Sequence, residues 1–142
     1  MIYLGACHCE AIGFAYETAV APDAWTMRAC ACRFCRTHSA ATTADPLGHL
    51  ELRCRDPERL VRYQFGLHTA SFWLCSVCGV YLSAVTTDGR FGIINTHALI
   101  DRPARLPAVD SVSYDGETAA VRTERRHRRW TPIRSPGLPG AS

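Results

Sequence analysis

The sequence Cys30-Ala-Cys-Arg-Phe-Cys35 places three thiols within six residues. One buried cysteine can serve as a small apolar side chain, but a cluster of three indicates metal binding or thiol chemistry. Two further pairs stand apart from this cluster: Cys7-His-Cys9 upstream and Cys75-Ser-Val-Cys78 downstream, the latter followed by Gly79. Seven of the eight cysteines therefore occur in close groups, and Cys54 stands alone.

The seven grouped thiols divide most simply into four and three. A structural zinc site takes four tetrahedral ligands, whereas a catalytic zinc commonly has three protein ligands and an open position. The two outer pairs can supply the ligands of a structural zinc: Cys7, Cys9, Cys75 and Cys78. A second zinc, with a fourth position open to water or substrate, would be held by Cys30, Cys32 and Cys35. This division rests on counting, and iron–sulfur ligation also suits thiolates, although C-x-C-x-x-C departs from the common ferredoxin spacings.

The chain has the length of one domain, and its sequence gives no sign of a membrane segment. It has 142 residues, of which 47% are apolar, and none of its apolar runs approaches the roughly 18–20 residues of a membrane span. The first residues, Met1 to Cys7, lack the charged start and long apolar stretch of a signal peptide. We therefore expect a cytoplasmic protein, in which clustered cysteines favour metal binding or catalysis over disulfides.

Apolar residues alternate with small or polar ones along most of the chain, which is the pattern of half-buried β-strands. The expected strands lie near residues 2–4, 12–16, 25–29, 50–54, 61–65, 70–74, 80–85, 91–96 and 112–114. Asp88-Gly89 predicts a hairpin turn, and Asp56-Pro57 predicts the start of a short helical turn. Cys54 alternates with Leu50 and Leu52, so we expect it on the core face. The predicted fold class is mainly β, with little helix.

Positive charge is concentrated at the carboxyl end of the chain. Residues 1–121 hold ten arginines and twelve acidic residues, whereas residues 122–142 hold six arginines and one acidic residue, and lysine is absent. We therefore predict a domain over residues 1–115 and a basic, Pro/Gly-rich tail over residues 116–142. The tail is expected to include a short helix within 116–130 and to be disordered from Pro132 onward. The body does not have the charge of a nucleic-acid-binding surface.

Three motifs, in order along the chain, resemble a known family: Gly5-Ala-Cys-His-Cys9, Cys30-Ala-Cys-Arg-Phe-Cys-Arg36 and Phe72-Trp-Leu-Cys-Ser-Val-Cys-Gly79. Over residues 3–110 the chain is similar to the glutathione-dependent formaldehyde-activating enzyme family, which includes centromere protein V. The resemblance implies small antiparallel sheets in a zinc-stabilised β-tent. It also implies a structural zinc on the four outer thiols and a catalytic-type zinc on the three central ones.

The family's named activity is the addition of glutathione to formaldehyde, which gives S-(hydroxymethyl)glutathione and is formally a carbon–sulfur lyase reaction. The resemblance therefore implies an enzyme whose partners are glutathione or another small thiol and a small aldehyde. One departure is Ala40, because the family usually has glycine after Arg36-Thr-His-Ser39. The extra methyl group would narrow or reshape a substrate pocket.

Several charged residues near the central thiols are weaker candidates. Three arginines could offset the charge of a thiolate–zinc group or hold the carboxylates of a glutathione-like ligand, and they could equally be solvated: Arg28, Arg33 and Arg36. His38 could relay a proton or replace a metal ligand, although a loop histidine is the simpler interpretation. His8 is expected to be a spacer, and His97 a core or rim residue.

The sequence thus predicts a zinc-dependent carbon–sulfur lyase-like enzyme that acts on a thiol–aldehyde adduct. One alternative is a non-catalytic module in which both zincs are structural and Arg125 to Arg129 contact nucleic acid or another acidic partner, a role that a basic tail less often has. Another alternative is a sensor of zinc or thiol redox state. Neither a membrane nor a nucleic acid is the expected partner, and the oligomeric state is not predicted.

Overall fold

The computed structural model describes residues 1–134. The strands are β1 (Ile2–Ala6), β2 (Ile12–Glu17), β3 (Arg28–Cys30), β4 (Thr42–Thr43), β5 (His49–Cys54), β6 (Leu60–Tyr63), β7 (Ala70–Cys75), β8 (Tyr81–Thr86), β9 (Phe91–Asn95), β10 (Asp110–Val112) and β11 (Thr131–Pro132). The helices are α1 (Arg33–Thr37) and α2 (Ala119–Arg129), with 3-10 turns η1 (Pro22–Ala24), η2 (Pro57–Arg59) and η3 (Thr96–Ala98). The expected mainly β class is confirmed. None of the helices in residues 1–134 is long and apolar enough to cross a membrane.

The strands form two sheets, a small one and a large one. The small sheet has the antiparallel order β1-β2-β5, and the large sheet has the order β10-β3-β4-β9-β8-β7-β6, with β11 added alongside β9. All pairs are antiparallel except β10 with β3, where Asp110 lies opposite Arg28 and Val112 opposite Cys30. The sheets are thus antiparallel, as the resemblance implied, apart from this one pair at the edge of the large sheet. The parallel pair is possible because the long connection between β9 and β10 lets β10 run in the same direction as β3.

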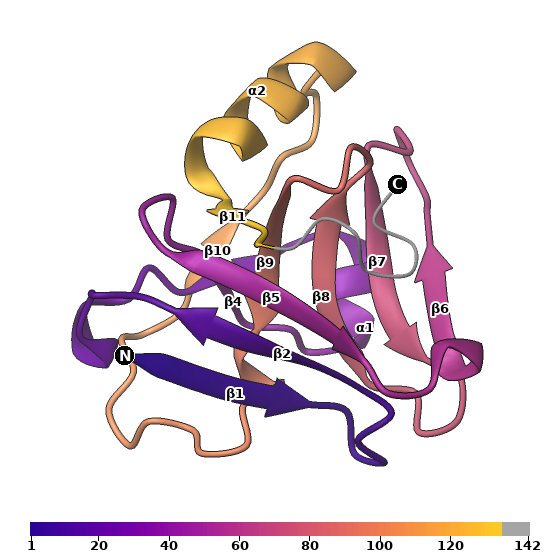
Figure 1. The fold of residues 1–142 in the computed structure, drawn as a ribbon. Helices are drawn as coiled ribbons and strands as arrows, with labels where there is room; N and C mark the ends of the chain where they lie inside the picture. Colours follow the sequence, from indigo (N-terminus) through magenta and orange to yellow (C-terminus); the bar gives the residue numbers. More distant parts are fainter. Residues whose placement is uncertain (135–142) are drawn as a thin grey trace.

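The two faces of the large sheet carry different clusters of apolar side chains. Trp73 and Ile94 belong to the main core, which also holds the buried side chains of β2 and β5. Their sequence neighbours Phe72 and Ile93 belong to a second cluster. Because side chains alternate across a strand, one face of the large sheet packs against the small sheet and the other face is left for α1 and α2. Figure 1 shows the small sheet in front of the large one, with α1 behind and α2 above.

Three local predictions are confirmed. Strands β8 and β9 are joined by a tight hairpin in which Gly89 has a φ of +74° and donates its amide to the Thr86 carbonyl. Asp56 caps the short η2 turn by accepting a hydrogen bond from the Glu58 amide at 3.2 Å. Cys54 is partly buried and packs against the main core, as its alternation indicated.

The carboxyl-terminal segment differs from the expected tail as far as it is described. Helix α2 forms within the predicted 116–130 stretch, and its N-cap Thr118 accepts a hydrogen bond from the Val121 amide at 3.2 Å. Trp130 is buried in the second cluster, and β11 pairs with β9. This segment thus packs on the fold through Trp130 and Arg126, whose side chains are buried. The disorder expected from Pro132 onward is not seen through Arg134, and residues 135–142 lie outside the described residues.

Candidate metal centres and the adjoining cavity

The four outer thiols come together from turns of the two sheets. Cys7 and Cys9 lie in the turn after β1, Cys75 ends β7, and Cys78 lies in the turn before β8. The Sγ atoms of Cys9 and Cys75 are 3.4 Å apart, those of Cys7 and Cys9 are 3.7 Å apart, and all four lie within 4.8 Å of one another. Four sulfurs around a zinc at the usual Zn–S length would be about 3.8 Å apart. The donor set and its spacing therefore fit a tetrahedral zinc site.

Donor groups lower the pKa of Cys9 and Cys78, whereas burial raises the pKa of Cys7 to about 11. The Cys78 amide points at the Cys75 sulfur at 3.4 Å, as expected for a C-x-x-C turn, and the Arg59 guanidinium approaches the Cys9 sulfur at 3.7 Å. Burial opposes ionisation of Cys78, but the backbone amides of Cys9 and Val80 and the neighbouring thiols bring its pKa down to about 6. Arg59 offsets part of the negative charge that four thiolates would leave on a bound zinc.

The three central thiols belong to one short segment of chain. Cys30 ends β3, Cys32 is the N-cap of α1, and Cys35 lies within that helix. Their Sγ atoms lie within 4.8 Å of one another, and the Cys35 amide donates to the Cys32 sulfur at 3.4 Å. These three sulfurs fit three of the four positions of a zinc ion, and no fourth His, Cys, Asp or Glu in residues 1–134 joins them.

Two of these thiols, Cys30 and Cys35, shift each other's pKa in opposite directions. A hydrogen bond from Cys35 is the main reason that the pKa of Cys30 is low, at about 5, and the charge of Arg122 lowers it further. The same hydrogen bond, together with burial, raises the pKa of Cys35. Of these two thiols, Cys30 is therefore the first to become a thiolate.

A cavity of about 250 Å³ opens beside the three-thiol group. All three of its cysteines line this cavity, whereas none of the four outer thiols does. One wall is aromatic and is formed by Phe65, Phe72, Tyr81 and Trp130. The cavity lies on the second face of the large sheet, where α1 and α2 pack, so a ligand in it would meet the thiols and the aromatic rings together.

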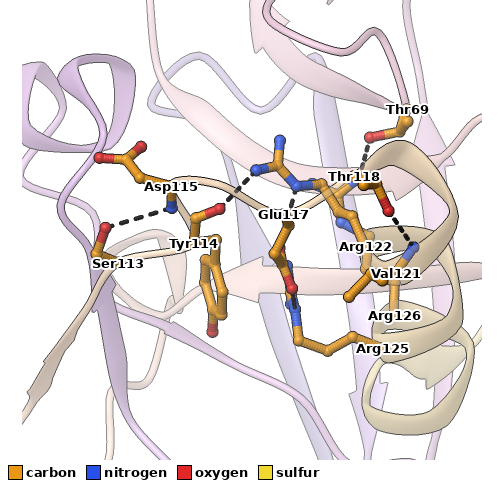
Figure 2. A network of polar contacts seen from close by, with 10 residues as sticks. All are labelled: Thr69, Ser113, Tyr114, Asp115, Glu117, Thr118, Val121, Arg122, Arg125 and Arg126. Atoms are coloured by element: carbon orange, nitrogen blue, oxygen red, sulfur yellow. Dashed lines mark hydrogen bonds and ion pairs between the residues drawn. The ribbon is translucent and has the colours of Figure 1, made fainter.

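Helix α2 supplies three of the four arginines that line the cavity, and Figure 2 shows their polar contacts. Arg122 and Arg125 are held by Glu117: Arg125 Nε and Nη2 donate to its two carboxylate oxygens at 2.8 and 2.9 Å, and Arg122 Nε donates at 3.2 Å. These hydrogen bonds outweigh burial and lower the pKa of Glu117 to about 2. Arg126 is buried, and its Nη1 donates to the Thr69 Oγ1 at 2.6 Å. Three guanidinium groups are thereby fixed at the cavity.

The comparisons with known proteins agree with the cysteine pattern. The family model of the glutathione-dependent formaldehyde-activating enzyme matches residues 2–113. The chain belongs to this family. A crystal structure of a Rhodobacter sphaeroides protein is also similar, with a TM-score of 0.59 and 29% sequence identity, and the match covers 77% of this chain and 99% of that one. A comparison with curated proteins finds no significant match.

Of the three arginines proposed from the sequence to bind substrate, only one lines the cavity. Arg28 lines the cavity. Arg33 and Arg36 are exposed and are not among the residues that line it, and the Arg36 Nε donates to the Ala31 carbonyl at 3.1 Å. Ala40, the departure from the family pattern, is buried in the second apolar cluster.

The histidines lie outside both thiol groups. His38 packs against the rings of Phe34 and Tyr81, with centroid distances of 4.6 and 5.7 Å, and His8 and His97 are exposed. Of the two positions expected for His97, the core is excluded by its exposure, and the residue is not among those that line the cavity. None of the three belongs to a ligand group.

The sequence patterns do not predict that residues of α2 line the cavity. The family match gives no help here, because it ends at residue 113, before this helix. The run 125–129 was interpreted as a charged tail, yet Arg125 is paired with Glu117 and Arg126 is buried. A signal was present: Arg122, Arg125 and Arg126 follow the i, i+3, i+4 spacing of one helix face.

Proposed function

We propose that this protein is a zinc-dependent carbon–sulfur lyase-like enzyme that joins a thiol to a small aldehyde. By family membership the pair is glutathione and formaldehyde, and the product is S-(hydroxymethyl)glutathione. The observation that carries the proposal is the contrast between the two thiol groups. The three-thiol group lines the 250 Å³ cavity, whereas the four-thiol group does not line it and has a full set of four ligands.

Each thiol group has a distinct role in this proposal. Cys7, Cys9, Cys75 and Cys78 would hold a structural zinc, and Cys30, Cys32 and Cys35 would hold the zinc that faces the cavity. When bound there, zinc would supply Lewis acidity that lowers the pKa of a nearby thiol. Over the reaction the thiol sulfur bonds to the carbonyl carbon, and the proton released by the thiol ends on the carbonyl oxygen.

The cavity walls would bring the two reactants together and keep water out. The aromatic rings are apolar and displace water from the cavity. A thiol held against them is therefore less solvated than in bulk water. Holding both reactants in one cavity can contribute several kcal/mol to the rate, because it replaces a bimolecular encounter. Tyr81 would add a hydrogen-bond donor, since its hydroxyl is buried at this cavity and has no partner in residues 1–134.

The test is the rate of S-(hydroxymethyl)glutathione formation, followed by exchange NMR with zinc-loaded protein. We expect wild type to accelerate formation, Cys32→Ser to lose the acceleration, and Cys54→Ser to keep it because Cys54 lies outside both thiol groups. A wild-type rate equal to the uncatalysed rate, with zinc bound, would rule out the formaldehyde reaction.

Native mass spectrometry gives an independent measurement. We expect two zinc ions on wild type and on Cys54→Ser, and one zinc on a folded Cys32→Ser. Addition of glutathione should cap or release one of the two zincs in wild type. Two zincs that remain inert to glutathione would instead indicate a binding module.

A further inference from the structure

The proposed reaction leaves Arg126 unexplained. This residue is only 8% exposed, and it makes no ion pair with an acidic side chain in residues 1–134. Its guanidinium lies 4.7 Å from the Trp130 ring, its Nη1 donates to Thr69, and its buried Nε has no partner among the described residues. Arginine cannot shed its proton in a protein, and a buried charge without a counter-charge is costly. This guanidinium is therefore placed to receive an anion.

The surroundings of Arg126 add positive charge instead of neutralising it. Burial first, and then the charges of Arg125 and Arg122, lower its pKa to about 10, so it remains a cation at neutral pH. The acidic groups close to it are Glu117, which is engaged by two other arginines, and the exposed Asp115 on the cavity rim. Four arginines line the same cavity: Arg28, Arg122, Arg125 and Arg126. Positive charge is in excess at this wall.

Thr69 completes the arrangement around the guanidinium. Its hydroxyl oxygen accepts the bond from Arg126 at 2.6 Å, which leaves its own hydrogen for another acceptor. A carboxylate oxygen could accept from both the Thr69 hydroxyl and the Arg126 Nε. Charge-assisted bonds of this kind are about twice as strong as neutral ones.

The same cavity holds the three-thiol group. A molecule that fills it would present sulfur to Cys30, Cys32 and Cys35 and an anionic group to α2, with apolar carbon against Phe72 and Tyr81. This combination selects a compact thiol that carries a carboxylate. The α2 contribution follows residue 113, where the family match ends.

We propose that Arg126 and Thr69, flanked by Arg122, form a carboxylate-binding site that selects carboxylate-bearing thiols as substrates of this protein. The proposal rests on the proposed function in one respect, since it takes the thiol to react at the three-thiol group. Glutathione belongs to this class of thiols, and so do smaller thiols with one carboxylate.

The test compares two probes of matched length, 3-mercaptopropionate and 3-mercapto-1-propanol, which differ in the carboxylate. Calorimetric titration of the zinc-loaded full chain should show that wild type binds the carboxylate thiol about tenfold to a hundredfold more tightly. Arg126→Gln should abolish this preference. Arg128→Gln, which makes the same charge change at an exposed position of α2, should keep it.

Two outcomes would overturn the proposal. One is a wild type that binds both probes equally, and the other is an Arg126→Gln variant that weakens both probes by the same factor, because the guanidinium would then act on the metal group alone. If Arg126→Gln does not fold, Arg126→Lys and Thr69→Val replace it, and each should reduce the preference several-fold. An unchanged preference in both would also overturn the proposal.

The measurements separate this proposal from the proposed function. A carboxylate preference without any acceleration of adduct formation would support the site and contradict the lyase function. Acceleration without a preference, in wild type, would support the lyase function and contradict the site.

Discussion

The hydroxyl of Tyr81 is a buried polar group at the cavity wall that no protein atom among residues 1–134 satisfies. The Tyr81 side chain is 2% exposed. Burial raises its pKa well above the usual value, and the thiolates of Cys35, Cys32 and Cys30 raise it further. The hydroxyl thus stays protonated at neutral pH and can donate to a substrate oxygen. A phenylalanine would fill the same space without the unpaired group, so packing alone does not account for the hydroxyl, and we expect it to bind a ligand in the cavity.

Replacing Tyr81 with phenylalanine should separate activity from stability. We expect Tyr81→Phe to slow adduct formation about tenfold to a hundredfold, because a donor near the reacting atoms is lost. Its thermal midpoint should be unchanged or slightly higher, since no hydrogen bond within the protein is broken. Tyr63→Phe is the matched control, because Tyr63 is 48% exposed and is not among the cavity residues. A lower midpoint with a normal rate in Tyr81→Phe would show that the hydroxyl is structural.

At the scale of elements, α2 is held by one carboxylate. Glu117 lies just before the helix and binds Arg122 and Arg125, whose guanidinium also lies 3.6 Å from the Tyr114 ring. Hydrogen bonds from Arg125 hold the pKa of Glu117 at about 2, below its ordinary value of 4.5. A group with a lowered pKa stabilises the fold above its unfolded pKa and loses that contribution as the pH falls toward its folded pKa. The contribution of Glu117 is therefore complete above about pH 5 and declines toward pH 2.

Glu117→Gln should destabilise the protein by roughly 1–3 kcal/mol at pH 7, because charge-assisted hydrogen bonds to two arginines are weakened. Glu124→Gln, at an exposed position of α2 without an ion pair in the described chain, should change stability by at most about 0.5 kcal/mol. Urea unfolding of the zinc-loaded variants measures both. The difference between wild type and Glu117→Gln should be constant from pH 6 to 8. A difference that titrates in this range would contradict the assignment.

The strands could be predicted from the sequence, whereas the role of α2 could not. Strand β7 shows the reason: Phe72 and Leu74 pack in the second cluster, whereas Trp73 and Cys75 lie in the main core. This alternation has the period of two residues that a strand imposes, so it is a local property of the chain. Cysteine grouping was likewise visible, because both C-x-x-C turns are local. The docking of α2 depends on buried contacts of Arg126 with Thr69, which is 57 residues away in sequence. The local periodicity of apolar residues carries no information on a contact between distant residues. The arginine-rich composition of residues 125–129 by itself indicates a solvated tail.

At the scale of the whole molecule, the two thiol groups connect very different lengths of chain. The four-thiol group joins the turn after β1 in the small sheet to the turn between β7 and β8 in the large sheet, and Cys9 and Cys75 are 66 residues apart. A metal bound there would act as a cross-link between the sheets, and its binding energy would become folding energy. The three-thiol group spans only residues 30–35, so a metal bound to it would close no long loop.

Chelation should therefore remove the two metals in a fixed order. A limiting chelator should first take the metal of the three-thiol group, which faces the cavity, with no loss of the core signal from the buried Trp25 and Trp73. Release of the second metal should coincide with unfolding.

The same difference should appear in variants of the two thiol groups. Cys78→Ser should lower the thermal midpoint by at least about 10 °C, because the sheets lose their cross-link, whereas Cys32→Ser should change it by a few degrees. Metal release followed by mass spectrometry, with tryptophan fluorescence alongside, measures this order. Simultaneous loss of both metals with unfolding would contradict it, because a metal held by six consecutive residues would then support the fold as much as one that joins the sheets.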